Sequence, residues 1–423
     1  MMTPYTYPKT GDTVYRMKHA SGLDILVWPQ PTACSAYATF VTRYGSVYNT
    51  LPTPDGGIEE VPPGIAHYLE HKLFESEDGD AFVRFSATGA AANAYTAFDR
   101  TAYLFQATEN ILPSLDILLD FVRHPYFTDE TVKKEQGIIG QEIRMCEDEP
   151  EEQVLFKMLE GMYHRHPVRI DIGGTVESIA AITPELLYRC YERYYDLHNM
   201  VLVVAGKITP EEVEDAADRL LLPAPPQPPV VFSIDEPLSI VTHRVEKTMP
   251  VASPLFSLGF KEPPAPQTAE RIAGAQFILE LIVGKSTGFY AHLLEERLVN
   301  DEFGAEYFSG PGYGIWLFGG ESADPDRVAQ EIRNEILRLQ REGPDAAAIE
   351  RIRRAVYGRT VSQMDNAAHN AEFLLGSVID GIEPFSELDA LASLTVAQIH
   401  EQLCRRVPAD EYTLSVISPP TGE

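Results

Sequence analysis

The sequence predicts an α+β protein of two similar domains, each a mainly antiparallel sheet packed with helices. A proline-rich segment, PAPPQPP at 223–229, divides the 423 residues almost evenly. Prolines end helices and central strands and favour an extended spacer. Each half contains β-like runs, a helix-rich middle and a closing β-like run. We therefore expect a domain over 1–222, a proline-rich linker over 223–237 and a homologous domain over 238–423.

The β-like runs are short segments rich in β-branched and aromatic residues. In the first half they lie at 24–28, 37–44, 102–107 and 200–206, and in the second half at 255–260, 314–319 and 412–417.

One pattern occurs in both halves. Residues 103–122 and 316–336 each contain a β-like run, a turn and an amphipathic helix, and a second helix follows each, from Thr128 and from Gly343. Such a repeat indicates duplicated domains. Two domains of this kind could face each other across a cleft, where ligand sites are common.

The size and composition of the chain agree with packed domains. Apolar residues make up 44% of it, with 19 Phe and 20 Tyr, which excludes disorder over most of its length. Acidic residues outnumber basic ones by 63 to 34, a net charge of −29. This charge repels phosphate backbones and anionic headgroups, so we expect neither nucleic acid nor a membrane as partner. It serves solubility, or it attracts basic ligands.

The segment GIAHYLEHKLFE places three chemically active side chains on one helix face. His67, Glu70 and His71 fall within about 100° of arc if the segment is helical. Two imidazoles one turn apart suit Zn²⁺, and Glu70 would stand where it can take a proton from metal-bound water. The order H-x-x-E-H is that of the inverted zincins. The alternative is an ordinary helix with surface histidines.

A third ligand is available on the helix expected over 129–145. Glu135 and Glu142 are seven residues apart and share a face, with Ile138 and Ile139 between them. Acids on a partly apolar stripe are costly to bury without a cation, which favours a metal or histidine partner. A solvated, glutamate-rich helix is the alternative.

These motifs together resemble a known family. H-x-x-E-H followed about seventy residues later by E-x6-E is similar to the inverzincin peptidases of the pitrilysin/insulinase type, which include the mitochondrial processing peptidases. NAYTAFDRTAYLF at 93–105, YHRHP at 163–167, the pair Gly173–Gly174 and the run NMVLVVAG from Asn199 resemble further landmarks of that family. The chain is most similar to short bacterial members, often encoded in pairs and linked to modification of translation elongation factor P.

The resemblance implies a role for each site residue. His67, His71 and Glu142 would bind one Zn²⁺ per chain, although manganese or cobalt also suits such a site. Glu70 would be the catalytic general base and Glu135 an auxiliary catalytic acid that orients the ligands.

The resemblance also implies a fold, a substrate and an activity. Asn93 and Ala94 would lie on an exposed strand edge to which an extended peptide substrate adds. The implied fold is the LuxS/processing-peptidase-like metallohydrolase fold, arranged as half of a clamshell. The implied activity is that of a zinc metalloendopeptidase acting on short or unfolded peptides inside a chamber.

The second half departs from the family pattern. It has no H-x-x-E-H, and Arg297 is followed seven residues later by Gly304 where the family has Tyr, with Tyr307 three positions further on. We expect a homologous partner subunit or a second copy of the chain to supply the missing groups. The alternative is a non-hydrolytic peptide-binding or assembly subunit of a complex involved in protein modification. The intact Glu70 argues against it, because a structural zinc site needs no base.

The remaining metal-binding candidates have simpler interpretations. His164 and His166 alternate before Pro167 and could chelate a metal or serve a turn. The four cysteines are far apart and form no C-x-x-C, which indicates a reducing compartment. With no secretory signal and no run of about 18 apolar residues, we expect a cytoplasmic protein.

Overall fold

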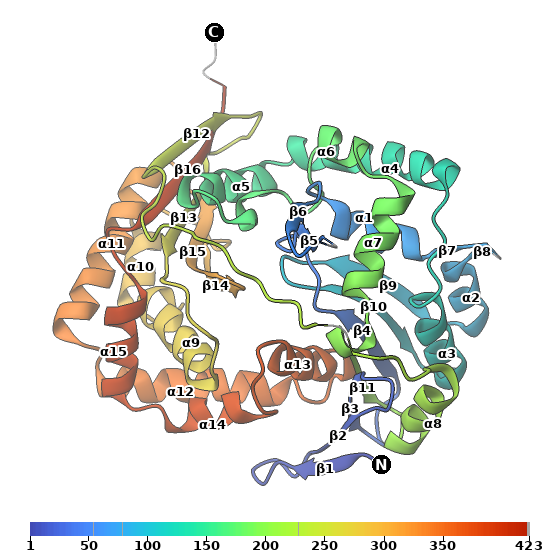
Figure 1. Ribbon diagram of the computed structural model, residues 1–423. Coiled ribbons are helices and arrows are strands. Elements are labelled where there is room, and N and C mark those ends of the chain that lie inside the picture. Colours follow the sequence, from blue (N-terminus) through green and yellow to red (C-terminus); the bar gives the residue numbers. More distant parts are fainter. Residues whose placement is uncertain (54, 78, 227, 421–423) are drawn as a thin grey trace. The chain divides into compact units, whose positions relative to one another are not determined.

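The computed structural model describes residues 1–53, 55–77, 79–226 and 228–420 (Figure 1). Gln227 of the predicted linker and residues 421–423 of the predicted second domain lie outside the described residues. Contacts divide the chain into two compact units. Unit 1 comprises Met1–Ile143, Asp171–Val231 and Ser362–Pro384, and unit 2 comprises Arg144–Ile170, Phe232–Val361 and the chain from Phe385 onward.

Unit 1 contains a seven-stranded sheet of order β1-β2-β3-β11-β4-β10-β9, in which only β3 and β11 are parallel neighbours. Its strands are β1 (Thr3–Thr6), β2 (Thr13–Lys18), β3 (Asp24–Pro29), β4 (Ala36–Thr42), β9 (Ala91–Thr96), β10 (Thr101–Ala107) and β11 (Met200–Gly206). Its helices are α1 (Ile65–Leu73), α2 (Ala81–Thr88), α3 (Ile111–Phe121), α4 (Asp129–Asp148), α6 (Val176–Ala180), α7 (Pro184–Tyr194), α8 (Pro210–Leu220) and α13 (Ala367–Ile379). Two short hairpins complete it, β5 (Thr50–Pro52) with β6 (Ile58–Glu60) and β7 (Glu75–Ser76) with β8 (Gly79–Asp80).

Unit 2 contains a five-stranded sheet of order β12-β16-β13-β15-β14, in which only β12 and β16 are parallel neighbours. Its strands are β12 (Arg244–Thr248), β13 (Leu255–Lys261), β14 (Gly304–Gly310), β15 (Tyr313–Glu321) and β16 (Tyr412–Ser418). Its helices are α5 (Pro150–Met162), α9 (Ala269–Val283), α10 (Gly288–Glu295), α11 (Pro325–Glu342), α12 (Ala346–Ser362), α14 (Ser386–Ser393) and α15 (Val396–Arg406).

The two sheets share one topology. The order β3-β11-β4-β10-β9 in unit 1 recurs as β12-β16-β13-β15-β14 in unit 2, with the parallel pair at the same place. All seven predicted β-like runs are strands of these sheets. The predicted fold class, two homologous α+β domains with mainly antiparallel sheets, is confirmed. The clamshell arrangement stays a prediction.

Helix α13 covers one face of the sheet in unit 1. Strands β4 and β11 are buried along their whole length, although successive side chains of a strand point to opposite faces. On one face Phe40 joins the main core with residues of α1, α3 and α7. On the other face Tyr37 donates a hydrogen bond to Glu372 of α13, and Trp28 packs against Phe373. The second covering layer therefore comes from a helix that lies far along the chain.

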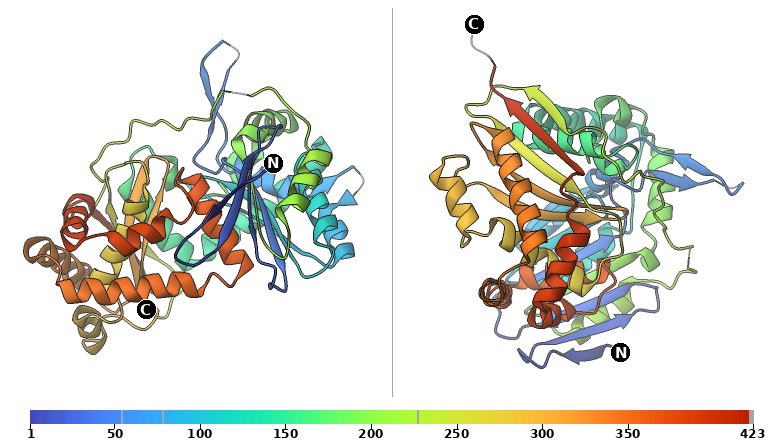
Figure 2. Two further views of the ribbon diagram at one scale, coloured as in Figure 1. Left: turned by 90° about the horizontal axis from the view of Figure 1, so that it is seen from below. Right: turned by 90° about the vertical axis from the view of Figure 1, so that its left-hand side faces the viewer.

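Helix α5 covers one face of the sheet in unit 2, as α13 does in unit 1. Gly259 of β13 lies directly against Met158 and Met162 of α5. Helices α11 and α15 lie on the other face (Figure 2). A helix from the first half of the chain thus completes unit 2, and a helix from the second half completes unit 1. The predicted linear division around 223–237 stays a prediction, but the compact units do not coincide with 1–222 and 238–423.

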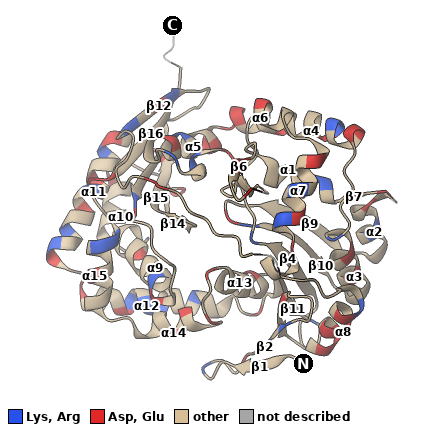
Figure 3. Ribbon diagram, viewed as in Figure 1, with Lys and Arg blue, Asp and Glu red and all other residues tan. Residues whose placement is uncertain are grey.

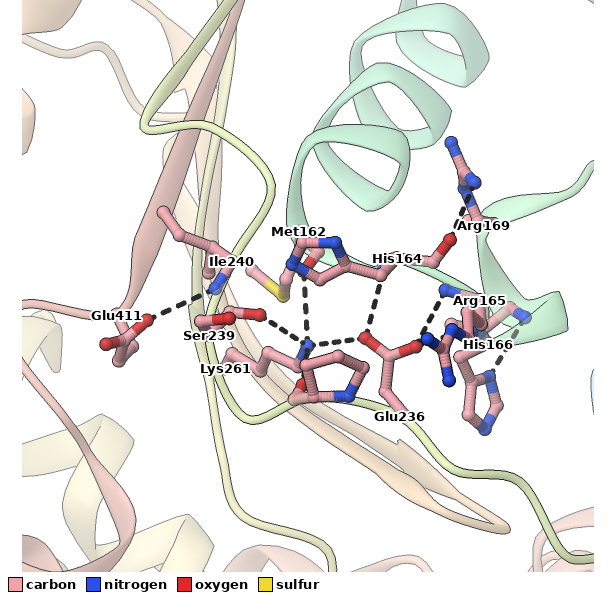
Figure 4. Close-up of polar contacts among 12 residues, drawn as sticks. Met162, His164, Arg165, His166, Arg169, Glu236, Ser239, Ile240, Lys261 and Glu411 are labelled. Atoms are coloured by element: carbon pink, nitrogen blue, oxygen red, sulfur yellow. Dashed lines mark hydrogen bonds and ion pairs between the residues drawn. The ribbon is translucent and has the colours of Figure 1, made fainter.

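A buried ion pair fixes the chain after the proline-rich segment in unit 2 (Figure 4). The carboxylate of Glu236 accepts hydrogen bonds from the backbone N–H groups of His164, Arg165 and His166, at 2.8–2.9 Å. It also lies 2.7 Å from the ammonium group of Lys261. The region that we expected to be linker up to residue 237 is therefore part of the packed structure at Glu236.

His166 has a structural role. It is fully buried, and its Nε2 lies 2.8 Å from the carbonyl oxygen of Pro311. Burial lowers the pKa of His166 to about 4, so the ring is neutral at neutral pH. This contact supports the turn interpretation of the HRHP segment over metal chelation.

Helix α8, PEEVEDAADRL, carries five acidic residues and one basic residue, and Figure 3 shows its acidic positions. Among the described residues no single helix has the length and apolarity of a membrane span, but the bent pair α9 and α10 together meets that criterion.

Candidate metal centre

Helix α1 carries the H-x-x-E-H segment. It begins after Gly64, whose φ of 91° is unfavourable for other residues and where a Cβ would collide with the carbonyl oxygen of Gly173. Gly174, with φ of 75°, packs equally closely against the carbonyl of Pro63. The buried face of α1 presents residues such as Leu69 to the core. The two glycines therefore set the position from which α1 starts.

The structure brings together the three predicted metal ligands. His67 Nε2 lies 3.6 Å from Glu142 Oε1, and His71 Nε2 lies 3.4 Å from Glu142 Oε2. One ligand atom from each of the three residues can be chosen so that all lie within 4.8 Å of one another. Two imidazole nitrogens and one carboxylate are the donor set of a catalytic zinc site, which leaves a position for water. The residues present therefore fit a Zn²⁺ ion.

Glu135 contacts one of these candidate ligands. Its Oε1 lies 3.0 Å from His71 Nδ1, so a proton on Nδ1 is shared with the carboxylate and Nε2 is directed toward Glu142. The hydrogen bond to His71 lowers the pKa of Glu135. The predicted auxiliary acid thus contacts one of the candidate metal ligands and also lines the pocket beside Glu70.

The two histidines differ electrostatically. Burial, followed by the charge of His71, lowers the pKa of His67 to about 4. Its Nδ1 is buried and has no hydrogen-bond partner among the described residues. Burial also acts to lower the pKa of His71, but its hydrogen bond to the Glu135 carboxylate and the charges of Glu70 and Glu142 outweigh it and raise that pKa. His67 is therefore neutral, as a metal ligand must be, at neutral pH.

Glu70 stands beside the ligands on the same helix face. Thr96 of β9 donates a hydrogen bond of 2.6 Å to Glu70 Oε2. Burial raises the pKa of Glu70, although the bond from Thr96 opposes the effect. A carboxylate held in place, with its pKa shifted toward neutrality, suits a general base. Sequence reasoning did not single out Thr96, which stands at the end of the NAYT segment.

A pocket of about 530 Å³ opens next to Glu70 and His71. Phe74 and Phe82 line it with their rings stacked 4.2 Å apart. Ile138 of α4 lines it as well. Charged and polar residues such as Glu77 and Lys134 line the rest of it, so the pocket can hold a substrate side chain against the aromatic rings with polar groups nearby.

Asn93 and Ala94 line the same pocket. They lie on β9, which is an edge strand of the sheet and, in the part of the chain that the structure describes, pairs with β10 alone. The side-chain oxygen of Asn93 accepts a hydrogen bond of 2.9 Å from the N–H group of Ala94. The predicted substrate-binding residues are therefore on a sheet edge next to the metal centre.

The three positions at which the second half departs from the family pattern lie in unit 2. Arg297 follows α10 with a positive φ of 54°, and Gly304 opens β14. Tyr307 of β14 accepts a hydrogen bond from Gln267, and the guanidinium of Arg406 lies over its ring.

Two family models match the chain. The model described as "Insulinase (Peptidase family M16)" matches residues 56–176, which contain the candidate metal centre. The model described as "Peptidase M16 inactive domain" matches residues 181–356.

Similar proteins are found over the whole chain. A Bacillus subtilis protein named "Uncharacterized zinc protease YmfH" is 36% identical, over 99% of this chain and 100% of its own. The crystal structure of an M16-like peptidase from Alicyclobacillus acidocaldarius has a TM-score of 0.92 at 35% identity, over 99% of this chain and 100% of that one. An Arabidopsis thaliana protein named "Probable mitochondrial-processing peptidase subunit beta" is 23% identical, over 79% of this chain and 67% of its own.

Proposed function

This chain belongs to the M16 (insulinase) family of peptidases, and on that premise we propose that it is a zinc-dependent metallopeptidase that hydrolyses short or unfolded peptides. The family resemblance drawn from the sequence is thereby confirmed. The observation that carries the proposal is the convergence of His67, His71 and Glu142 beside Glu70.

The proposed reaction uses Glu70 as the proton carrier. Zn²⁺ held by His67, His71 and Glu142 would polarise the scissile carbonyl and acidify the attacking water. The Glu70 carboxylate accepts the proton of that water and then passes it to the leaving amine. Thr96 keeps Glu70 Oε2 in position through both transfers.

We propose that the substrate binds as an added strand on β9. An edge strand offers unpaired main-chain groups to an extended peptide. The N–H group of Ala94, now bonded to the side chain of Asn93, would instead donate to a substrate carbonyl. One substrate side chain would enter the pocket lined by Phe74 and Phe82.

A homologous partner subunit, or a second copy of the chain, remains part of the proposal. It is supported by Gly304, which stands where the family has Tyr. The chamber, the link to elongation factor P modification and the cytoplasmic location also stay predictions. All four cysteines are free, which suits a reducing compartment.

Metal binding tests the proposed function directly. We expect the purified chain to contain about one zinc ion, and we expect Glu142→Gln to lose most of it together with peptide hydrolysis, because a neutral amide is a poor zinc ligand. Elemental analysis and a fluorogenic peptide assay, run with and without a homologous partner, measure both. Glu147→Gln makes the same charge change on an exposed position of α4 and should keep the metal. Full zinc content in Glu142→Gln would contradict the assignment.

Glu135→Gln is expected to weaken zinc binding by about 10- to 100-fold, because residues that hydrogen-bond a metal ligand typically contribute that much. The amide removes the charge that fixes the proton on His71 Nδ1. Competition with a chromophoric chelator measures the affinity. Glu130→Gln, exposed on the same helix, is the control. An unchanged affinity would show that Glu135 does not orient the ligand.

A further inference from the structure

Strand β9 connects the candidate metal centre to the opposite face of its sheet. Among the described strands its one neighbour is β10, so the sheet's hydrogen bonds hold it along one edge. Adjacent residues of a strand point to opposite faces. Thr96 bonds to Glu70 of α1, whereas Tyr95 bonds to Glu372 of α13. The strand is therefore held from both faces by contacts at neighbouring residues.

Glu372 links this edge strand to the centre of the sheet. Its Oε2 accepts a hydrogen bond of 3.3 Å from the hydroxyl of Tyr95, and its Oε1 accepts one of 3.0 Å from the hydroxyl of Tyr37 on β4. Hydrogen bonds to a charged acceptor are stronger than neutral ones. The carboxylate, which α13 carries against the buried strands β4 and β11, thus bonds to the ring on β9 from a helix that is held by its own packing.

The two tyrosine hydroxyls that donate these hydrogen bonds stay protonated at neutral pH. Burial, reinforced by the charge of Glu372, raises the pKa of Tyr37 and of Tyr95 above the usual value of a tyrosine. The turn between β9 and β10 has a second link to α13, since the charge of Asp380 at its C-terminal end acts on Arg100. Helix α13 therefore interacts with β9 and with the turn that follows it.

We propose that Glu372 is a positioning residue: through Tyr95 it holds β9 so that Thr96 keeps Glu70 in its catalytic position. This inference rests on the proposed peptidase function. Helix α13 lies in the second half of the sequence, and the inference gives it a supporting role in the candidate metal centre, whose residues all come from the first half. A catalysed reaction slows when the residues that hold a catalytic group allow it to move by even a small distance.

The test compares two tyrosines that bond to the same carboxylate. Tyr95→Phe removes the bond to the edge strand, and Tyr37→Phe removes the bond to the central strand. We expect Tyr95→Phe and Glu372→Ala to lower kcat about tenfold, the range of one hydrogen bond, with little change in KM. Glu372→Gln, which keeps one acceptor, should recover part of the rate. Tyr37→Phe should change kcat by less than about threefold.

Hydrogen exchange separates this inference from the proposed function. Exchange of residues 91–96 should become about tenfold faster in Tyr95→Phe, whether or not the chain hydrolyses peptides, while zinc content stays unchanged. Equal effects of the two tyrosine variants on kcat, or unchanged exchange at 91–96 in Tyr95→Phe, would overturn the positioning role. A wild-type chain that binds no zinc and cleaves no peptide would refute the peptidase proposal and leave the exchange result to decide the role of Glu372.

Discussion

Replacing Glu70 by glutamine is expected to lower the rate of peptide hydrolysis by about 10²- to 10⁴-fold, the usual contribution of a general base. Glutamine has nearly the same shape and can still accept the hydrogen bond from Thr96, but it cannot take a proton from water. Because Glu70 is not one of the three metal-binding residues, zinc content should stay at the wild-type value. Initial rates on a fluorogenic peptide and elemental analysis of the same samples measure the two quantities.

The control for this variant is Glu109→Gln, which removes the same charge from an exposed turn of unit 1. It should leave the rate and the zinc content unchanged. If Glu70→Gln instead hydrolysed peptides at the wild-type rate, the chain would not use Glu70 as its base. If neither wild type nor variant hydrolysed peptides but both bound a peptide and zinc, a non-hydrolytic assembly subunit would be the better description.

The second large effect concerns stability. Glu236→Ala is expected to destabilise unit 2 by about 3–5 kcal/mol, because removing one partner leaves the other charge buried and unpaired. The side chain of Lys261 is 3% exposed, and Glu236 is the one carboxylate within salt-bridge distance of its ammonium group among the described residues. Its other hydrogen bonds go to backbone carbonyls, such as those of Pro237 and Ser239, and it lies over the ring of Tyr163, so none of these contacts neutralises its charge. Three backbone N–H groups would lose their acceptor as well.

The two tryptophans of the chain make this measurement possible. Trp316 is fully buried in unit 2 and Trp28 lies in unit 1, so urea unfolding followed by fluorescence in a Trp28→Phe background reports on unit 2. Asp235→Ala is the matched control, since that side chain is 98% exposed and pairs only with Arg165 at the surface. A loss in Glu236→Ala no larger than that of the control would contradict the importance of the buried pair.

The same pair predicts a pH dependence. Burial acts to raise the pKa of Glu236, but Lys261 and the backbone N–H groups outweigh it and lower the pKa from 4.5 to about 2. The folded carboxylate therefore binds its proton less readily than the unfolded one. Its contribution to stability is complete above about pH 4.5 and is lost as the pH falls toward 2. In Glu236→Ala the free energy of unfolding should lose this part of its dependence on pH.

The local patterns of the sequence predicted the central strands and the ligand helices. Runs such as 200–206 and 255–260 are almost entirely apolar, with Ser257 the polar exception, because helices cover both faces of these strands. His67, Glu70 and His71 are close in sequence, and helical periodicity places them on one face. Glu142 needed a family resemblance, because no local rule states that α4 lies against α1.

Contacts between distant segments could not be predicted in this way. The helical periodicity of α13 gives the face that it buries, but not the sheet against which that face packs. Tyr95 and Glu372 are 277 residues apart, and nothing in either segment specifies the partner. The composition of the compact units could not be predicted for the same reason, since a proline-rich segment marks a break in secondary structure and not the allocation of helices to sheets.

The exchange of α5 and α13 has a consequence for any protease that cuts the chain near residues 223–229. The amino-terminal fragment would retain α5, on which the other sheet depends, and the carboxy-terminal fragment would retain α13. The nicked molecule should therefore co-purify as one particle under native conditions and separate only in denaturant. Neither fragment, expressed from its own gene, could complete a fold without the other.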